Sequence, residues 1–169
     1  MTRGTTRPAE LRDAAAIARI YNEGIADRIA TFETEPRTAE QIARTLADRA
    51  ARWPMVVVER DGEVIGWAGA SEYRPRACYA GVAEFSVYVA REARGSGAGR
   101  LAMEALIAAC TERGIWKLVS RVFPENAPSR RLLLRVGFRE VGTYRRHAKL
   151  DGNWRDTVIV ERLIGEASG

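Results

Sequence analysis

Apolar residues near the start of the chain recur every three or four positions, the spacing of one face of a helix. This spacing predicts a helix over residues 11–24, after a short strand at residues 5–8. Thr38, followed three residues later by Gln41, matches a capping box, which predicts that a second helix begins there and ends near residue 51. The first third of the chain is therefore expected to be mainly helical.

Runs of β-branched and aromatic residues, separated by turn residues, follow this helical part. Residues 55–59 and 64–71 flank an Asp-Gly turn and predict an antiparallel hairpin, which a third run at 81–89 extends. The later elements are expected in this order: a Gly-rich turn, a helix at 97–113, a strand at 116–122, a helix at 127–136, and a second hairpin of strands 138–149 and 154–162. A strand-helix-strand unit is a parallel crossover, so the predicted class is α/β with a mixed sheet.

Composition and charge narrow the range of partners. The chain has 169 residues, 46% apolar and 29% charged, which is the profile of one globular domain. No apolar stretch reaches the roughly 18 residues of a membrane span, and the first residues lack a secretion signal's apolar core, so we expect a cytoplasmic protein without a membrane partner. The net charge is +5, but no run of five basic residues occurs, which disfavours nucleic acid. With His147 as the single histidine, no metal site is expected.

The segment 87–101, between a predicted strand and a predicted helix, is the most informative in the chain. Gly95, Gly97 and Gly99 allow the backbone to approach a ligand closely, and the free N–H groups of the helix's first turn attract an anion such as a pyrophosphate. The loop lacks the Lys-Ser/Thr of a P-loop and does not follow the first strand, so neither nucleotide hydrolysis nor a dinucleotide-binding domain is favoured. A Gly-rich turn can also serve packing alone.

Two motifs resemble those of the GNAT N-acetyltransferase superfamily. Arg94-x-x-Gly97-x-Gly99 is similar to its R/Q-x-x-G-x-G/A acetyl-CoA loop, and residues 126–129 ahead of 136–138 are similar to its second motif. Four segments, residues 21–24, 31–34, 84–89 and 149–156, resemble its phosphinothricin and arsinothricin acetyltransferase branch. The resemblance covers nearly the whole chain. It implies one GNAT domain over 1–169, with a mostly antiparallel sheet, helices on both faces and acetyl-CoA as cosubstrate.

The resemblance also implies where acetyl-CoA binds, splitting the sheet beside the strand at 81–89. The implied cofactor-binding residues are Ser86, Val87, Tyr88, Val89, Arg94, Gly95, Ser96, Gly97, Ala98, Gly99, Arg100, Asn126 and Ser129. Amides near Val87 and Tyr88 are expected to hold the thioester carbonyl, and those of residues 95–99 the pyrophosphate. Asn126 and Ser129 suit the pantetheine arm, although both also suit a helix cap.

Acetylation of an amine requires a neutral nitrogen, so a group must accept a proton. Glu84 is the candidate base, because by alternation it shares a sheet face with Ser86 and Tyr88, and the branch carries glutamate in the matching place. The alternative is a solvated carboxylate paired with an arginine. Leu133 stands where many superfamily members carry a tyrosine that protonates the CoA thiolate. This leaves water, Tyr79 or Tyr88, or release of a stabilised thiolate.

Five residues are candidates for the acceptor pocket. Arg74 and Arg76 are expected to hold an anionic group, while Tyr73 and Phe32 wall the pocket. Lys149 falls in a segment that resembles the branch's C-terminal pocket and subunit contact. The alternatives are exposed loop cations for the arginines, core packing for the aromatic residues, and packing for Lys149.

These observations predict an enzyme that moves acetyl from acetyl-CoA to the α-amine of a small glutamate-like compound, by direct attack with Glu84 as base. Phosphinothricin, arsinothricin and methionine sulfoximine are the acceptors that the resemblance implies, with resistance as the role and a homodimer as the assembly. The first alternative is the same chemistry on another amine: an amino acid, a polyamine or a protein N-terminus. The second is a non-catalytic acyl-CoA-binding module.

Overall fold

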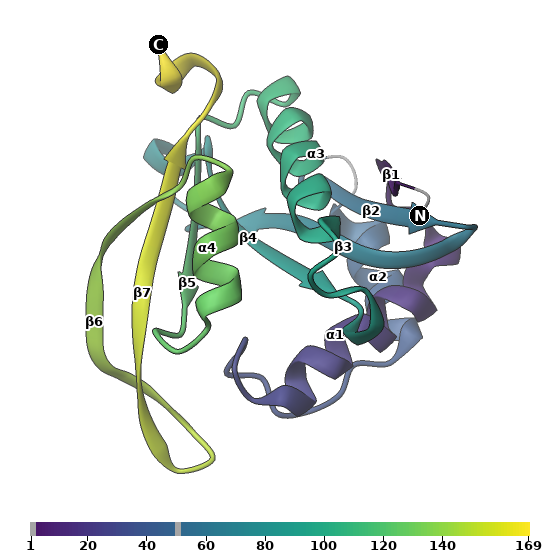
Figure 1. The fold of residues 1–169 in the computed structure, drawn as a ribbon. Coiled ribbons are helices and arrows are strands. Elements are labelled where there is room, and N and C mark those ends of the chain that lie inside the picture. Colours follow the sequence, from purple (N-terminus) through teal and green to yellow (C-terminus); the bar gives the residue numbers. More distant parts are fainter. Residues whose placement is uncertain (1–2, 50–51) are drawn as a thin grey trace.

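The computed structural model describes residues 3–49 and 52–169, whose strands form one seven-stranded sheet (Figure 1). The strands are β1 (Thr5–Pro8), β2 (Met55–Arg60), β3 (Glu63–Glu72), β4 (Val82–Val89), β5 (Lys117–Val122), β6 (Arg139–Leu150) and β7 (Asn153–Leu163). Their order is β1-β2-β3-β4-β5-β7-β6, and only the β4–β5 pair is parallel. The predicted mixed α/β sheet with one parallel crossover is confirmed.

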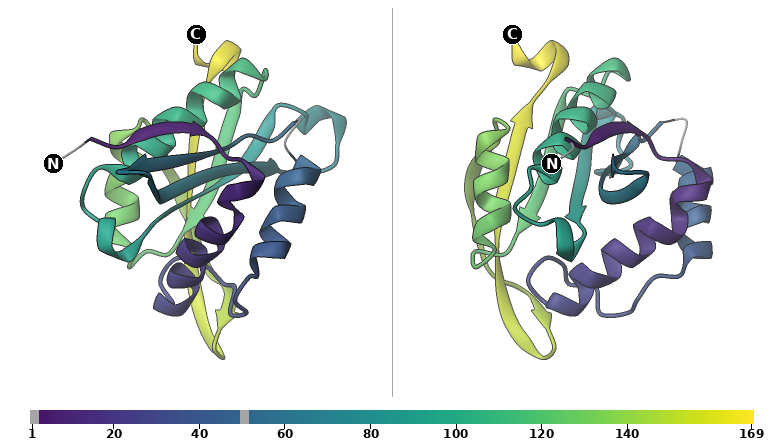
Figure 2. Two further views of the ribbon diagram at one scale, coloured as in Figure 1. Left: turned by 90° about the vertical axis from the view of Figure 1, so that its right-hand side faces the viewer. Right: turned by 45° about the vertical axis from the view of Figure 1, so that its right-hand side comes forward.

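Helices cover both faces of this sheet. They are α1 (Ala14–Asp27), α2 (Ala39–Arg49), α3 (Ala98–Glu112) and α4 (Ala127–Arg135). Figure 2 shows α1 and α2 on one face and α3 and α4 on the other. No helix within the described residues is both long and apolar enough to cross a membrane. The end predicted for the second helix, residue 51, lies outside the described residues.

The first helix differs from its prediction at the carboxyl end. It continues past Gly24 to Asp27, whereas the sequence predicted an end at Gly24. The reason is a close contact: a Cβ on Gly24 would lie 2.7 Å from two carbons of the Tyr88 ring. Glycine at this position lets the helix pack against β4 instead of ending the helix.

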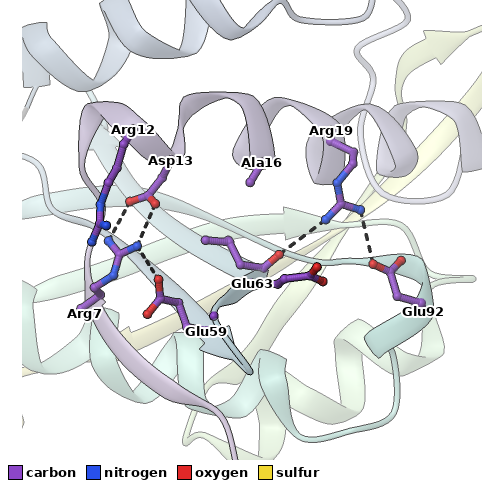
Figure 3. Close-up of a pocket in the computed structure, with 10 residues that line it drawn as sticks. Arg7, Arg12, Asp13, Ala16, Arg19, Glu59, Glu63 and Glu92 are labelled. Atoms are coloured by element: carbon purple, nitrogen blue, oxygen red, sulfur yellow. Dashed lines mark hydrogen bonds and ion pairs between the residues drawn. The ribbon is translucent and has the colours of Figure 1, made fainter.

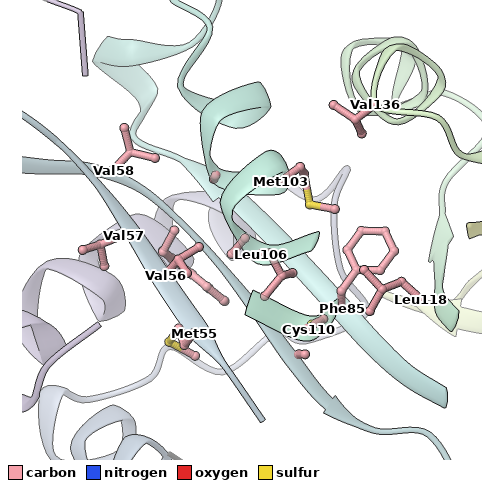
Figure 4. Packing of buried hydrophobic residues seen from close by; sticks show 14 of the residues in the cluster. Met55, Val56, Val57, Val58, Phe85, Met103, Leu106, Cys110, Leu118 and Val136 are labelled. Carbon is pink, nitrogen blue, oxygen red and sulfur yellow. The ribbon is translucent and has the colours of Figure 1, made fainter. Parts of the chain in front are cut away.

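The core on the α3 side is apolar and closely packed. Met103, Leu106 and Cys110 of α3 pack with Phe85 of β4 and Leu118 of β5, and all five are buried (Figure 4). Burial raises the pKa of the Cys110 thiol to about 12, so this free thiol stays protonated at neutral pH. The core therefore holds β4, β5 and α3 together without chemistry of its own.

The parallel pair β4–β5 separates after three residues. Its last paired residues are Glu84 and Val119, and beyond them β4 pairs only with β3, while β5 pairs only with β7. At the point of separation the Ser120 hydroxyl donates a hydrogen bond to the Phe85 carbonyl at 3.0 Å. Residues 85–89 of β4 and 120–122 of β5 are termed the fork below. Apart from the Phe85 carbonyl, the backbone of β4 within the fork pairs with no strand of the described residues except β3.

Candidate active site

The Gly-rich loop ends at α3 with its first amides free. Gly97 is the N-cap of α3, and the first helical hydrogen bond runs from the Leu101 amide to the Gly97 carbonyl. Gly95 and Gly97 have φ of +78° and +90°, conformations that other residues rarely adopt, and a Cβ on either would meet open space. Gly99 differs, because its Cβ would lie 2.9 Å from Leu132. Gly95 and Gly97 thus shape the loop, and Gly99 also allows close packing of α4.

Helix α1 holds this loop through two acidic residues. The Arg91 amide donates to Glu23 Oε2 at 2.7 Å, and Asp27 pairs with Arg91 at 2.9 Å and with Arg94 at 2.7 Å. Burial would raise the pKa of Asp27, but hydrogen bonds and charge from Arg94 and Arg91 hold it below its usual value. Arg94, a predicted cofactor residue, is therefore oriented by α1 beside the loop.

Glu84 lies at the start of the fork. Its neighbours across the two ladders are Ser71 of β3 and Val119 of β5, and the side chain is half-buried. None of the hydrogen bonds or ion pairs found within residues 3–49 and 52–169 involves its carboxylate. The described residues therefore do not support the alternative interpretation, in which Glu84 pairs with an arginine.

Tyr88 of the fork is part of an aromatic cluster beneath α1. Its ring stacks on Trp67 with centroids 5.2 Å apart and meets the edge of Tyr21 at 5.0 Å. Burial raises the pKa of Tyr88, so the phenol stays protonated at neutral pH. Tyr79, the other tyrosine considered as a proton donor, lies edge-on to Tyr73 in the β3–β4 loop, outside the fork. Leu133 is buried in the core and offers no proton.

The five acceptor candidates fall into three contact groups. Phe32, after α1, meets the Phe123 ring edge-on at 4.9 Å, at the carboxyl end of β5. Residues 73–79 form the second group, with Arg74 5.1 Å from the Tyr73 ring and Arg76 5.8 Å from the Tyr79 ring. The third is Lys149, 4.6 Å from the exposed Trp154 ring in the β6–β7 hairpin. No hydrogen bond, ion pair or ring contact within the described part of the chain joins Phe32 directly to the other two groups.

Three tyrosines interact with Arg74. A hydrogen bond to Tyr73, with added charge interactions from Tyr79 and Tyr144, raises the pKa of Arg74 above its already high value. Because Tyr144 belongs to β6, Arg74 lies within electrostatic range of the last hairpin. A permanently charged arginine here suits an anionic acceptor group.

Asn126 and Ser129 form the amino end of α4. Asn126 is the N-cap, and its Oδ1 accepts a hydrogen bond from the Ser129 amide at 3.3 Å. The Ser129 hydroxyl takes no part in this cap. The capping geometry fixes the Asn126 side chain so that its Nδ2 donors remain for a ligand, which is compatible with the predicted pantetheine contact.

A second charged region lies at the β1 side of the sheet, around a hollow of about 520 Å³ (Figure 3). Arg7 binds Asp13 with two hydrogen bonds of 2.8 Å and Glu59 with one of 2.7 Å. Arg12 and Arg19, which also line the hollow, have carboxylate partners as well. Every arginine that lines this hollow has a carboxylate partner. None of the predicted site residues lines the hollow.

Comparisons with known proteins identify the family that this chain resembles. The model of the acetyltransferase (GNAT) family matches residues 17–138. A phosphinothricin N-acetyltransferase of Alcaligenes faecalis is 37% identical over 163 residues, which cover 95% of this chain and 82% of that protein. An L-methionine sulfoximine/L-methionine sulfone acetyltransferase of Pseudomonas aeruginosa is 29% identical over 157 residues, which cover 92% and 91%.

A solved structure shows the same architecture with the cosubstrate bound. It is a GNAT superfamily phosphinothricin acetyltransferase from Sinorhizobium meliloti in complex with acetyl-CoA, with a TM-score of 0.91 at 30% identity. The match covers 99% of this chain and 91% of that one. The predicted superfamily is confirmed, and the non-catalytic alternative falls away. The chain belongs to the GNAT family and is an acetyl-CoA-dependent N-acetyltransferase.

Proposed function

We propose that this enzyme acetylates the α-amine of small glutamate-like amino-acid analogues, such as phosphinothricin, arsinothricin or methionine sulfoximine, with Glu84 as general base. The observation that carries the proposal is the Glu84 carboxylate, half-buried beside the fork and without a partner among the described residues. Relatives that act on phosphinothricin and on methionine sulfoximine support the acceptor class.

The fork and the loop fit the shape and charge of acetyl-CoA. Free amides at residues 98–100, ahead of the first helical hydrogen bond, suit the pyrophosphate. Backbone groups of residues 86–89 that face the fork suit the amides of a pantetheine arm, and Asn126 offers two further donors. When bound, acetyl-CoA supplies the activated acetyl group.

The residues of the chain then manage protons and charge. Glu84 accepts a proton from the acceptor's ammonium, directly or through one water, and so provides a neutral amine. The amides near Val87 and Tyr88 stabilise negative charge on the carbonyl oxygen as the amine attacks. Leu133 cannot donate a proton to the departing thiolate. Water and the protonated Tyr88 phenol are the remaining proton donors.

The acceptor's anionic group is assigned to Arg74, with Arg76 nearby, and its carbon chain to Phe32 and Tyr73. Arg74 keeps its charge at every physiological pH, and Phe32 presents a ring that is fixed by Phe123. We expect a homodimer in which Lys149 lies near the subunit contact. The β6–β7 hairpin that carries Lys149 extends beyond the rest of the sheet (Figure 1).

Glu84→Gln tests the base. We expect turnover with phosphinothricin to fall on the order of 100-fold near neutral pH, with unchanged acetyl-CoA affinity, because the variant keeps the shape but accepts no proton. The loss should shrink as the pH rises and the free amine becomes abundant. Glu63→Gln, an exposed carboxylate on β3, is the matched control. A folded Glu84→Gln enzyme with wild-type turnover would remove Glu84 from the mechanism.

An amine panel assayed by CoA release tests the acceptor class. We expect kcat/KM to be highest for phosphinothricin or methionine sulfoximine, and lower for alanine, spermidine and a short peptide. A neutral analogue should bind more weakly, because it leaves the anion-binding arginines without a partner. If a polyamine or the peptide were the best acceptor, the chemistry of Glu84 would stand and the acceptor class would be wrong.

A further inference from the structure

Arg155 of β7 contacts two segments that meet beside the fork, residues 123–125 after β5 and the end of α1. Its guanidinium carbon lies 4.2 Å from the centre of the Phe123 ring. Its Nη1 donates to the Arg28 carbonyl at 3.5 Å, and its Nη2 pairs with Glu125 at 3.2 Å. The side chain is only 21% exposed, so it is held within the structure and does not move freely in solvent.

Phe123 transmits this contact to the candidate acceptor pocket. The ring is buried, with Arg155 over its face and the edge of Phe32 at 4.9 Å. Arg155, Phe123 and Phe32 thus form a chain of contacts from β7 to the segment after α1. If the cation were absent, the Phe123 ring would lose a neighbour on its face, and Phe32 would lose a fixed support.

The same hairpin holds the end of α1 by a second route. Arg28 ends α1 with φ of +59° and pairs with Asp151, in the β6–β7 turn, at 3.1 Å. Arg28 therefore receives a hydrogen bond on its carbonyl from Arg155 and an ion pair on its guanidinium from Asp151. Phe32 follows four residues later, so its position depends on this corner.

The three contacts of Arg155 differ in strength. Glu125 is 64% exposed, and an ion pair with such a residue contributes little. The hydrogen bond to Arg28 is long. The cation over the buried face of Phe123 is the contact most removed from water, where such interactions are strongest. Its effect on Phe123 should therefore dominate.

We propose that Arg155 is a positioning residue for the acceptor: through Phe123 it fixes Phe32 and thereby sets acceptor affinity. This inference rests on the proposed function, since it requires Phe32 to line the acceptor pocket. Arg155 falls in the segment 149–156 that resembles the branch, but nothing in that segment predicts its contacts with Phe123 and Arg28. Its role arises from residues that lie far apart in sequence and meet only in the fold.

Steady-state kinetics of Arg155→Ala, Arg155→Lys and Arg155→Gln test the proposal. For Arg155→Ala we expect the KM for phosphinothricin to rise about 10-fold, while the KM for acetyl-CoA changes less than about 2-fold. Lysine should restore most of the acceptor affinity, because its ammonium can still lie over the ring, whereas neutral glutamine should not. Arg139→Ala, which breaks an ion pair with Glu161 elsewhere in the same hairpin, is the control.

A double variant separates positioning from general stability. If Arg155 acts through Phe32, the acceptor KM of Phe32→Ala/Arg155→Ala should equal that of Phe32→Ala alone. Equal losses for both substrates, or rescue by glutamine as complete as by lysine, would overturn the proposal. If Phe32→Ala itself left the acceptor KM unchanged, the pocket assignment would fail instead. Should Arg155→Ala not fold, the lysine and glutamine variants still give the comparison.

Discussion

The two charged regions of this enzyme are built differently. At the β1 side Arg7 binds Asp13 and Glu59 in a compact network, whereas at the fork Glu84 has no partner among the described residues. A paired carboxylate has lost much of its capacity to accept a proton, because its partner stabilises the charged form. An unpaired carboxylate keeps its capacity to accept a proton. The pairing in the first region therefore serves stability, whereas the unpaired carboxylate of the second region keeps the property that the proposed base requires.

The pKa of Asp13 shows how the first region works. Burial alone would raise the pKa of this 5% exposed carboxyl, but Arg7 and the Glu10 amide outweigh burial and lower it. A carboxyl with a depressed pKa stabilises the fold above its unfolded pKa of about 3.9. That contribution is lost as the pH falls through the lower, folded pKa.

The largest effect on stability is expected for Asp13→Asn. Removing one charge leaves the Arg7 guanidinium short of its main partner, so we expect the free energy of unfolding at neutral pH to fall by about 3 kcal/mol. Urea titrations should show this loss, and acid unfolding of the variant should begin from a lower plateau with less dependence on pH below about 4. Turnover per folded molecule should stay normal. A comparable fall in turnover would show that the two regions are not separate.

Within the Gly-rich loop, Gly97→Ala should matter more than Gly99→Ala for acetyl-CoA. Alanine at φ of +90° is strained by about 1–2 kcal/mol, so the loop amides should shift and the Kd for acetyl-CoA should rise about 10-fold. The Cβ of Gly99→Ala would lie 2.9 Å from the end of the Leu132 side chain, which can move, and at an ordinary contact distance of 3.5 Å from Val89. Thermal shifts with and without acetyl-CoA measure both. A larger loss of acetyl-CoA affinity for Gly99→Ala than for Gly97→Ala would show that the ligand approaches the backbone at Gly99.

The smallest effect is expected at the start of the fork, for Ser120→Val against Ser120→Thr. The two replacements have the same shape, but only threonine can donate to the Phe85 carbonyl, which the serine hydroxyl bonds at 3.0 Å. Losing that bond should cost about 1 kcal/mol and raise the KM for acetyl-CoA roughly 5-fold in the valine variant alone. Identical kinetics for the two variants would mean that this hydrogen bond does not fix the fork.

Much of the fold followed from local signals. Both Asp-Gly hairpin turns were predicted, and Asp61, Gly62, Asp151 and Gly152 all have positive φ, as the tight turn requires. The long interruption in β6 was not predicted. There the register with β7 shifts between Tyr144 and Ala148, and the Arg146 amide binds the Asp156 carboxylate at 2.7 Å. That partner comes from the neighbouring strand, so periodicity within β6 carries no trace of it.

In the candidate site, too, local features could be predicted from the sequence and tertiary contacts could not. The Gly-rich loop could be predicted because a strand, glycines and a helix follow each other in the chain. Asp27, Ser120 and Arg155 could not, since each acts on a residue that only the tertiary fold brings near. Glu84 was selected by strand alternation and resemblance, and its catalytic role stays a prediction.

The aromatic cluster under α1 has an optical consequence. Trp67 is buried and stacked on Tyr88, a residue of the fork, whereas Trp154 is exposed in the last hairpin. The indole of Trp67 therefore experiences an apolar, asymmetric surrounding that depends on how β4 lies. Once Trp53, Trp116 and Trp154 are replaced by phenylalanine, its near-ultraviolet circular dichroism and emission give the strand that pairs with β4 an intrinsic spectroscopic label, which needs no added dye.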